Sequence, residues 1–168
     1  MNKHCIIGLC CILFASFSAL RGQDVSEYNV PETAKDCMER HHVLDTYELS
    51  GRINPFYLRG DFNGDGRLDY AVLVIQKSTG KRGIYMCVGT AAYILGAGKS
   101  FHRSDGYDFT DFNFEAWTLY PRRTVIRSPE EGPAPRLRGE AILVQWPEAG
   151  SGIIYWDGKA FVYYALGG

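Results

Sequence analysis

Cysteine, histidine and unbalanced charge are scarce in this sequence, and each shortage excludes a class of protein. Basic residues number 18 and acidic residues 19, which leaves a net charge of −1. A nearly neutral chain gives no electrostatic reason to bind nucleic acid or an anionic membrane surface, so neither is expected as a partner. The four histidines and five cysteines show no ligand spacing for zinc. No Gly-x-Ser-x-Gly nucleophile elbow is present, and no catalytic residue is predicted.

A long apolar run occurs at the start of the chain. Cys5–Leu20 is apolar with small residues mixed in, follows Lys3, and is separated from Asp24 by Arg21, Gly22 and Gln23. This pattern is typical of a secretory signal peptide, which we place at residues 1–23, with cleavage after Ser18 or Gly22 and an uncleaved anchor as alternatives. We therefore expect a secreted or periplasmic protein, in which residues 24–168 form a single β-rich domain with no membrane span.

Removal of the signal peptide leaves two cysteines, Cys37 and Cys87. In an exported protein such a pair forms one disulfide when the fold brings the two Cα atoms close enough. The alternative is a pair of buried free thiols that pack as small apolar side chains. The sequence leaves both alternatives open.

One helix is expected near the beginning of the mature chain, over Val30–His42. Pro31 suits the first helical position, and Ala34, Cys37, Met38 and His41 fall on one helical face. The rest of the chain consists of short runs rich in aromatic and β-branched residues, which predict a mostly β fold of the α+β type. We expect an antiparallel sheet or a sandwich of hairpins.

The expected strands are bounded by turn residues. Tyr70–Ile75 is apolar at every position, so we expect both faces of that strand to be covered. Asp157-Gly158 predicts a two-residue hairpin turn within Ile153–Leu166. Ser128–Gly139 is rich in proline and glycine and predicts an exposed loop. The other expected strands are Leu44–Ser50, Ile84–Val88, Ala91–Leu95, Trp117–Tyr120 and Glu140–Trp146.

Residues 59–74, RGDFNGDGRLDYAVLV, place acidic and amide side chains at alternate positions before an apolar run. Counted from Asp61 as position 1, the spacing matches the opening of an EF-hand calcium loop, whose oxygens at positions 1, 3 and 5 and carbonyl at position 7 surround one ion. Position 12 is Val72 in place of the bidentate glutamate, so the loop would close earlier, at Asp69. The alternative is a polar turn with no metal. The positions are filled by Asp61, Asn63, Asp65, Gly66, Arg67 and Asp69.

The form Asp-x-Asn-x-Asp-Gly-x-x-Asp before an AVLV strand resembles the calcium loop of the FG-GAP and VCBS repeat families. The close match covers Gly60–Val74, and the ending IIYWDGKAFVYY is similar to the last hairpin of small exported bacterial proteins of this kind. The families repeat the unit to build a propeller, but one copy is present here, so a full propeller is not implied. The resemblance implies Ca²⁺ held by side-chain oxygens of Asp61, Asn63, Asp65 and Asp69 and by the carbonyl of Arg67.

These patterns together predict an exported, non-catalytic calcium-binding domain in which the ion is structural and the partner is a protein or a cell-envelope component. One alternative is an inhibitor or immunity-type protein against a secreted enzyme, with Ser128–Gly139 as the contacting loop. A weaker alternative is a small hydrolase with an unidentified active site. Arginines gather loosely around the proline-rich loop, either as solvated residues or as a patch for an acidic partner. They are Arg122, Arg123, Arg127, Arg136 and Arg138.

Overall fold

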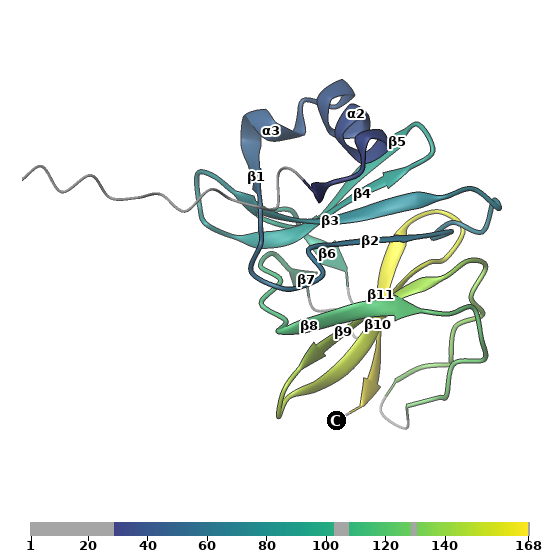
Figure 1. Ribbon diagram of the computed structural model, residues 1–168. Helices are drawn as coiled ribbons and strands as arrows, with labels where there is room; N and C mark the ends of the chain where they lie inside the picture. The colour runs from purple at the N-terminus through teal and green to yellow at the C-terminus, as the bar shows by residue number, and fades with distance from the viewer. Residues whose placement is uncertain (1–28, 103–107, 129–130, 168) are drawn as a thin grey trace, which may run out of the picture.

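The computed structural model describes residues 29–102, 108–128 and 131–167. The predicted signal peptide, residues 1–23, lies outside this part of the chain. The described residues form two antiparallel sheets that face each other, with two short helices on the outer side of the first sheet (Figure 1). This arrangement confirms the predicted mostly β fold built from antiparallel strands, and it is not a propeller.

The elements divide into a helical layer, two main sheets and a small ribbon. The helices are α2 (Glu32–Arg40) and α3 (Val43–Thr46). The first sheet contains β1 (Tyr47–Leu49), β2 (Tyr57–Gly60), β3 (Asp69–Gln76), β4 (Arg82–Val88) and β5 (Ala91–Gly96). The second contains β8 (Ala116–Tyr120), β9 (Ala141–Trp146), β10 (Gly150–Trp156) and β11 (Phe161–Gly167). The ribbon pairs β6 (Phe101–His102) with β7 (Asp108–Phe109).

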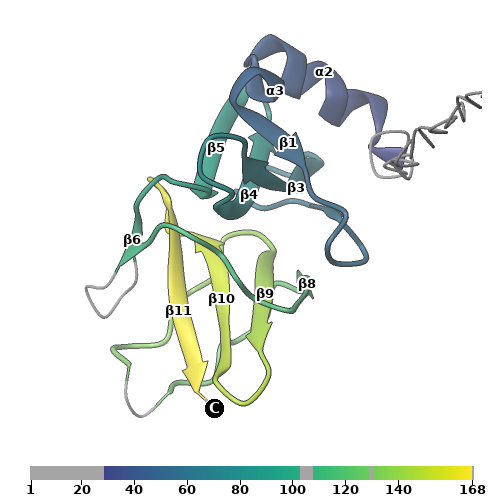
Figure 2. The same ribbon diagram turned by 90° about the vertical axis from the view of Figure 1, so that its left-hand side faces the viewer.

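Strand β3 organises the first sheet. The order is β1-β3-β4-β5, and β2 also pairs with β3. Because β1 lies opposite residues 74–76 and β2 lies opposite residues 69–72, these two short strands follow one another along the same edge of β3. The second sheet is a meander in the order β11-β10-β9-β8. Figure 2 shows the helices, the first sheet and the second sheet as successive layers.

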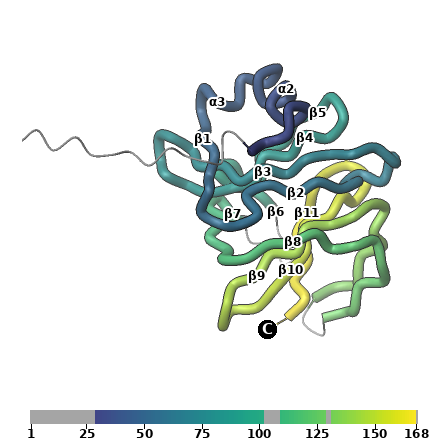
Figure 3. The backbone as a smooth tube through the Cα atoms, in the orientation of Figure 1, coloured from purple at the N-terminus to yellow at the C-terminus, as the bar shows by residue number. Residues whose placement is uncertain are grey.

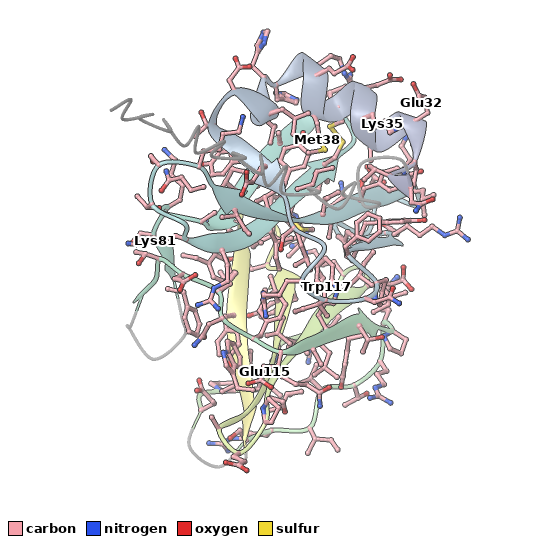
Figure 4. The ribbon with its side chains drawn as sticks, turned by 60° about the vertical axis from the view of Figure 1, so that its left-hand side comes forward. Glu32, Lys35, Met38, Lys81, Glu115 and Trp117 are labelled. Atoms are coloured by element: carbon pink, nitrogen blue, oxygen red, sulfur yellow. A yellow bond between two sulfur atoms is a disulfide. The ribbon has the colours of Figure 1, made fainter. Side chains whose placement is uncertain are left out.

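Both faces of β3 are buried, as its apolar sequence predicts. Ala71 and Leu73 belong to the core between the two sheets, whereas Val72 and Val74 belong to a second cluster beneath the helices. Alternate side chains of a strand point to opposite faces, so an uninterrupted apolar run fits a strand covered on both sides. Trp117, labelled in Figure 4, lies in the core between the sheets.

The predicted helix Val30–His42 corresponds to α2, and the structure contains a second, short helix, α3, directly after it. The first, α2, ends at Arg40, and His42 adopts a left-handed conformation with φ of 50° that starts α3. The predicted strand Leu44–Ser50 is correspondingly short, because Val43–Thr46 is helical and only Tyr47–Leu49 pairs with β3. Helix α2 buries Ala34, Cys37 and Met38 of the predicted face, and Met38 is labelled in Figure 4. His41, the fourth residue of that face, lies after the last residue of the helix and is exposed.

Cys37 and Cys87 form a disulfide, which resolves the alternatives left open by the sequence. Cys37 of α2 and Cys87 of β4 have Cα atoms 6.3 Å apart and are joined by an S–S bond. The hydroxyl of Tyr85 donates a hydrogen bond to the sulfur of Cys37 at 3.2 Å. The helical layer is therefore attached covalently to the first sheet.

The proline-rich segment differs from the simple exposed loop that its composition predicts. Residues 121–128 and 131–139, which follow β8 and precede β9, run across the outer side of the second sheet (Figure 3). Ser128 is buried and its backbone N–H donates to the hydroxyl of Tyr164 at 3.1 Å, while that hydroxyl donates to the carbonyl of Gly132. A tyrosine of β11 therefore fastens the segment to the sheet beneath it.

The last hairpin also differs from its prediction in the length of its turn. Trp156 pairs with Phe161, so four residues, Asp157–Ala160, connect β10 to β11 in place of a two-residue turn. One carboxylate oxygen of Asp157 accepts hydrogen bonds from the backbone N–H groups of Lys159 and Ala160, which stabilises the longer turn.

Among the helices of the described residues, none is long and apolar enough to cross a membrane.

Candidate metal centre

The predicted calcium loop connects β2 to β3 at one end of the first sheet. Gly60 pairs with Asp69 where the two strands meet, and residues 61–68 form the connection between them. Gly64 and Gly66 both have φ of 80°, a left-handed conformation that glycine adopts without steric cost. These glycines allow the chain to fold back around the side chain of Asp61.

Asp61 is the centre of this loop. One of its carboxylate oxygens, Oδ1, accepts hydrogen bonds from the backbone N–H groups of Gly64 at 2.7 Å and Asp65 at 3.0 Å. The other, Oδ2, accepts a hydrogen bond from the N–H of Gly66 at 3.0 Å. Three successive N–H groups therefore converge on one carboxylate, so the loop has a defined shape that its own side chain maintains.

Asn63 and Asp65 lie side by side on the more exposed side of the loop. The amide Nδ2 of Asn63 donates to Oδ2 of Asp65 at 3.0 Å, and the N–H of Arg67 donates to Oδ1 of Asp65 at 2.8 Å. The hydrogen bond from Asn63 holds the pKa of Asp65 below its usual range, and the hydrogen bond from the Arg67 N–H acts in the same direction to a smaller extent. Asp65 is thus ionised at neutral pH and faces solvent.

Asp69 has a different environment, because it is almost fully buried at the base of the loop. Its two carboxylate oxygens accept hydrogen bonds from the backbone N–H groups of Phe62 at 3.0 Å and Gly89 at 3.1 Å. Burial raises the pKa of Asp69 to about 6, although these hydrogen bonds act in the opposite direction. Asp69 connects the start of the loop to the turn between β4 and β5.

The loop is also attached to the second sheet, through a residue that sequence reasoning did not single out. Glu140 Oε2 accepts a hydrogen bond from the N–H of Asp61 at 2.9 Å, and the N–H of Glu140 donates to the carbonyl of Asp61 at 2.7 Å. Phe62 inserts into the core between the sheets. No local motif marks Glu140, because its partner lies 79 positions away in the sequence.

The oxygen donors of the loop fit a hard cation such as Ca²⁺ in their chemistry. The structure brings Asp61, Asn63 and Asp65 together in one hydrogen-bonded loop and places Asp69 beneath them, on backbone N–H groups. In residues 29–102, 108–128 and 131–167, no group of three or more His, Cys, Asp or Glu side chains is arranged to hold a metal ion. The predicted ligand set contains three carboxylates, those of Asp61, Asp65 and Asp69, and the structure does not bring these three into such a group.

Comparison with protein-family models, with curated proteins and with solved structures finds no match to this chain. The resemblance to the FG-GAP and VCBS calcium loop therefore stays a prediction.

The three tryptophans pack against the core between the sheets, Trp117 as a buried member and Trp146 and Trp156 as partly buried neighbours. His41 lies at the end of α2, where its Nε2 is 3.1 Å from the carbonyl oxygen of Thr90.

Proposed function

We propose that this protein is an exported, non-catalytic calcium-binding domain that binds a protein or cell-envelope partner. The observation that carries the calcium assignment is the convergence of the Gly64, Asp65 and Gly66 N–H groups on Asp61. This hydrogen bonding holds the loop in a folded shape with Asn63 and Asp65 toward its open side. A loop that is already ordered binds an ion with less loss of conformational entropy.

The role of the ion would be structural. Asp61 is bonded to Glu140 of the second sheet, and Asp69 is bonded to the turn after β4, so the loop is linked to two distant parts of the fold. A cation here would neutralise carboxylates that otherwise repel one another. Its binding free energy would then stabilise the junction between the two sheets.

Export is supported by the disulfide. A bond between Cys37 and Cys87 is stable in an oxidising compartment such as the periplasm or the extracellular medium, and it is rare in the cytosol. Calcium is also abundant enough in extracellular settings to occupy sites with a dissociation constant of roughly 10⁻⁴–10⁻³ M. The disulfide and the loop therefore suit the same environment.

The proposal is tested by thermal unfolding of the purified protein in 10 mM CaCl₂ and in chelator. For a dissociation constant near 10⁻⁴ M, ligand linkage gives about 2.7 kcal/mol of added stability. That corresponds to a rise in Tm of roughly 5–10 °C for a chain of this size. The Asp65→Ala variant removes a solvent-facing carboxylate that would bind the ion, so it should lose most of the calcium-dependent rise in Tm.

Asp157→Ala is the matched control, because Asp157 also accepts two backbone N–H groups in a turn but lies outside the loop. It should lower Tm in both solutions and keep the calcium-dependent rise. Equal Tm values in calcium and chelator, together with no bound calcium by elemental analysis, would show that the loop is a polar turn only.

A further inference from the structure

A hollow of about 470 Å³ opens on the outer side of the second sheet, between two runs of chain that lie after β8 and before β9. Residues 122–125 form one wall and residues 134–137 form the other. Val125 and Leu137 also contact the apolar cluster on this side of the sheet, so the hollow has an apolar base. Three arginines contribute to its lining, namely Arg122, Arg123 and Arg136.

These three positive charges have no negative partner in the described part of the chain. None of them forms an ion pair with a described carboxylate, and no described acidic residue lines the hollow. Cations gathered at one concave surface raise the local positive potential and attract anions. The guanidinium of Arg123 also stacks over the ring of Tyr120, 4.5 Å from its centroid, which restricts the position of that charge.

The shape and chemistry of the hollow select among anionic ligands. Planar guanidinium groups form paired hydrogen bonds with carboxylates, and the apolar base suits the methylene groups of an acidic side chain. Binding of sugars and nucleic-acid bases usually includes stacking on aromatic rings. The described lining residues include no aromatic side chain, and the ring of Tyr120 is already covered by Arg123.

We infer that this hollow is the docking site for an acidic peptide segment of a partner protein, one that carries at least two carboxylates in a short stretch. The inference rests on the proposed binding role and names the chemistry of the partner. This docking site does not require an ion in the proposed calcium loop. The loop connects two strands of the first sheet, whereas Arg122, Arg123 and Arg136 lie on the outer side of the second sheet.

Binding is measured by fluorescence anisotropy with a fluorescein-labelled hexaglutamate peptide and the purified protein, with hexaglutamine as the neutral control peptide. We expect saturable binding of hexaglutamate that weakens as salt is raised, and no binding of hexaglutamine. The triple variant Arg122→Glu, Arg123→Glu, Arg136→Glu should weaken the affinity at least tenfold. The corresponding triple lysine variant keeps the charge and should retain part of the affinity.

A second triple variant separates the hollow from the effect of net charge. Arg59→Glu, Lys99→Glu, Lys159→Glu changes the net charge by the same amount at exposed positions outside the hollow, and it should bind hexaglutamate within about twofold of the unmodified protein. Equal losses in both glutamate variants, or no binding of hexaglutamate at all, would overturn the inference. Binding of heparin or of phosphatidylglycerol vesicles without binding of hexaglutamate would also overturn it, in favour of a glycan or lipid ligand.

These outcomes are distinct from the calcium test. Retention of the calcium-dependent rise in Tm alongside absent peptide binding would reject the docking site and leave the calcium proposal standing. Binding of hexaglutamate together with no calcium-dependent rise in Tm would support the docking site and reject the calcium proposal.

Discussion

Asp61 and Glu140 bond to each other in both directions. The N–H of Asp61 donates to the carboxylate of Glu140 at 2.9 Å, and the N–H of Glu140 donates to the carbonyl of Asp61 at 2.7 Å. Asp61 begins the loop after β2, and Glu140 immediately precedes β9, so the pair joins the two sheets at the base of the proposed calcium loop.

Replacement of Glu140 tests the importance of this pair. Glu140→Ala leaves the N–H of Asp61 without its acceptor in a partly buried position, so we expect a loss of about 1–2 kcal/mol in the free energy of unfolding. Glu140→Gln keeps an oxygen acceptor and should cost less. Glu48→Ala, on the exposed side of β1, is the control and should change stability by no more than about 0.5 kcal/mol. Urea unfolding measures all three, and equal values for Glu140→Ala and Glu48→Ala would contradict the expectation.

Two glycines of the loop provide a comparison that isolates the contact between the sheets. Gly64 and Gly66 share a φ of 80°, so alanine introduces similar backbone strain at both, about 1 kcal/mol. A Cβ at Gly64 would lie 2.6 Å from the carbonyl oxygen of Arg138, whereas a Cβ at Gly66 would meet nothing within 4 Å. We expect Gly64→Ala to cost about 1–3 kcal/mol more than Gly66→Ala in chelator, measured by urea unfolding. Similar costs at the two positions would mean that the segment 138–140 does not pack on the loop.

The buried Asp69 predicts a dependence of stability on pH. Its folded pKa of about 6 lies above the ordinary value of 3.8, so the unfolded chain loses the proton more readily than the folded chain. The contribution of protonated Asp69 to the free energy of unfolding is therefore fully present below about pH 4. It is lost as the pH rises through about 6, which lowers the free energy of unfolding by about 3 kcal/mol. Carbonyl ¹³C NMR in chelator should show Asp69 titrating near pH 6, and calcium should lower that pKa because a nearby cation favours the carboxylate. Titration of Asp69 at its ordinary pKa in chelator would contradict this reasoning.

The disulfide predicts a large effect of cysteine removal. Cys37 and Cys87 are separated by 50 residues, and the chain-entropy estimate for a closed loop of this length is about 4 kcal/mol. The Cys37→Ala, Cys87→Ala double variant should lose about 3–4 kcal/mol in the free energy of unfolding. A reductant should destabilise the unmodified protein by a similar amount and leave the double variant unchanged. An effect of reductant on the double variant would show that it acts elsewhere.

Strand patterns and the helical face of α2 were predictable because they depend on local periodicity. The apolar run of β3 places Leu73 in one cluster and Val74 in the other, which requires only that successive side chains alternate between faces. The buried positions Ala34 and Cys37 of α2 follow from helical spacing in the same way.

The errors have local physical causes that residue type alone does not reveal. The predicted strand Leu44–Ser50 begins inside α3, because the left-handed conformation of His42 starts a helical turn over Val43–Thr46, in which the N–H of Asp45 donates to the carbonyl of His42. Asp157-Gly158 suits a two-residue turn, but the carboxylate of Asp157 caps two later N–H groups and lengthens it.

The candidate site is predictable only in its local part. The pattern from Asp61 to Asp69 predicts a loop with a turn at its glycines, and the structure contains that loop. The contacts of the loop with Glu140 and Gly89 involve residues distant in the sequence, so they follow from the packing of the sheets. The same limit applies to the hollow with its arginines, whose two walls meet only in the folded chain.

The disulfide between Cys37 and Cys87 closes a covalent ring that contains the whole of the Asp61–Asp69 loop. The exposed residues of that loop are the kind of site at which proteases cut. A single cut anywhere between the two cysteines would open the ring but leave both fragments joined by the disulfide. Damage at the most accessible part of the proposed metal site would therefore not release any piece of the molecule.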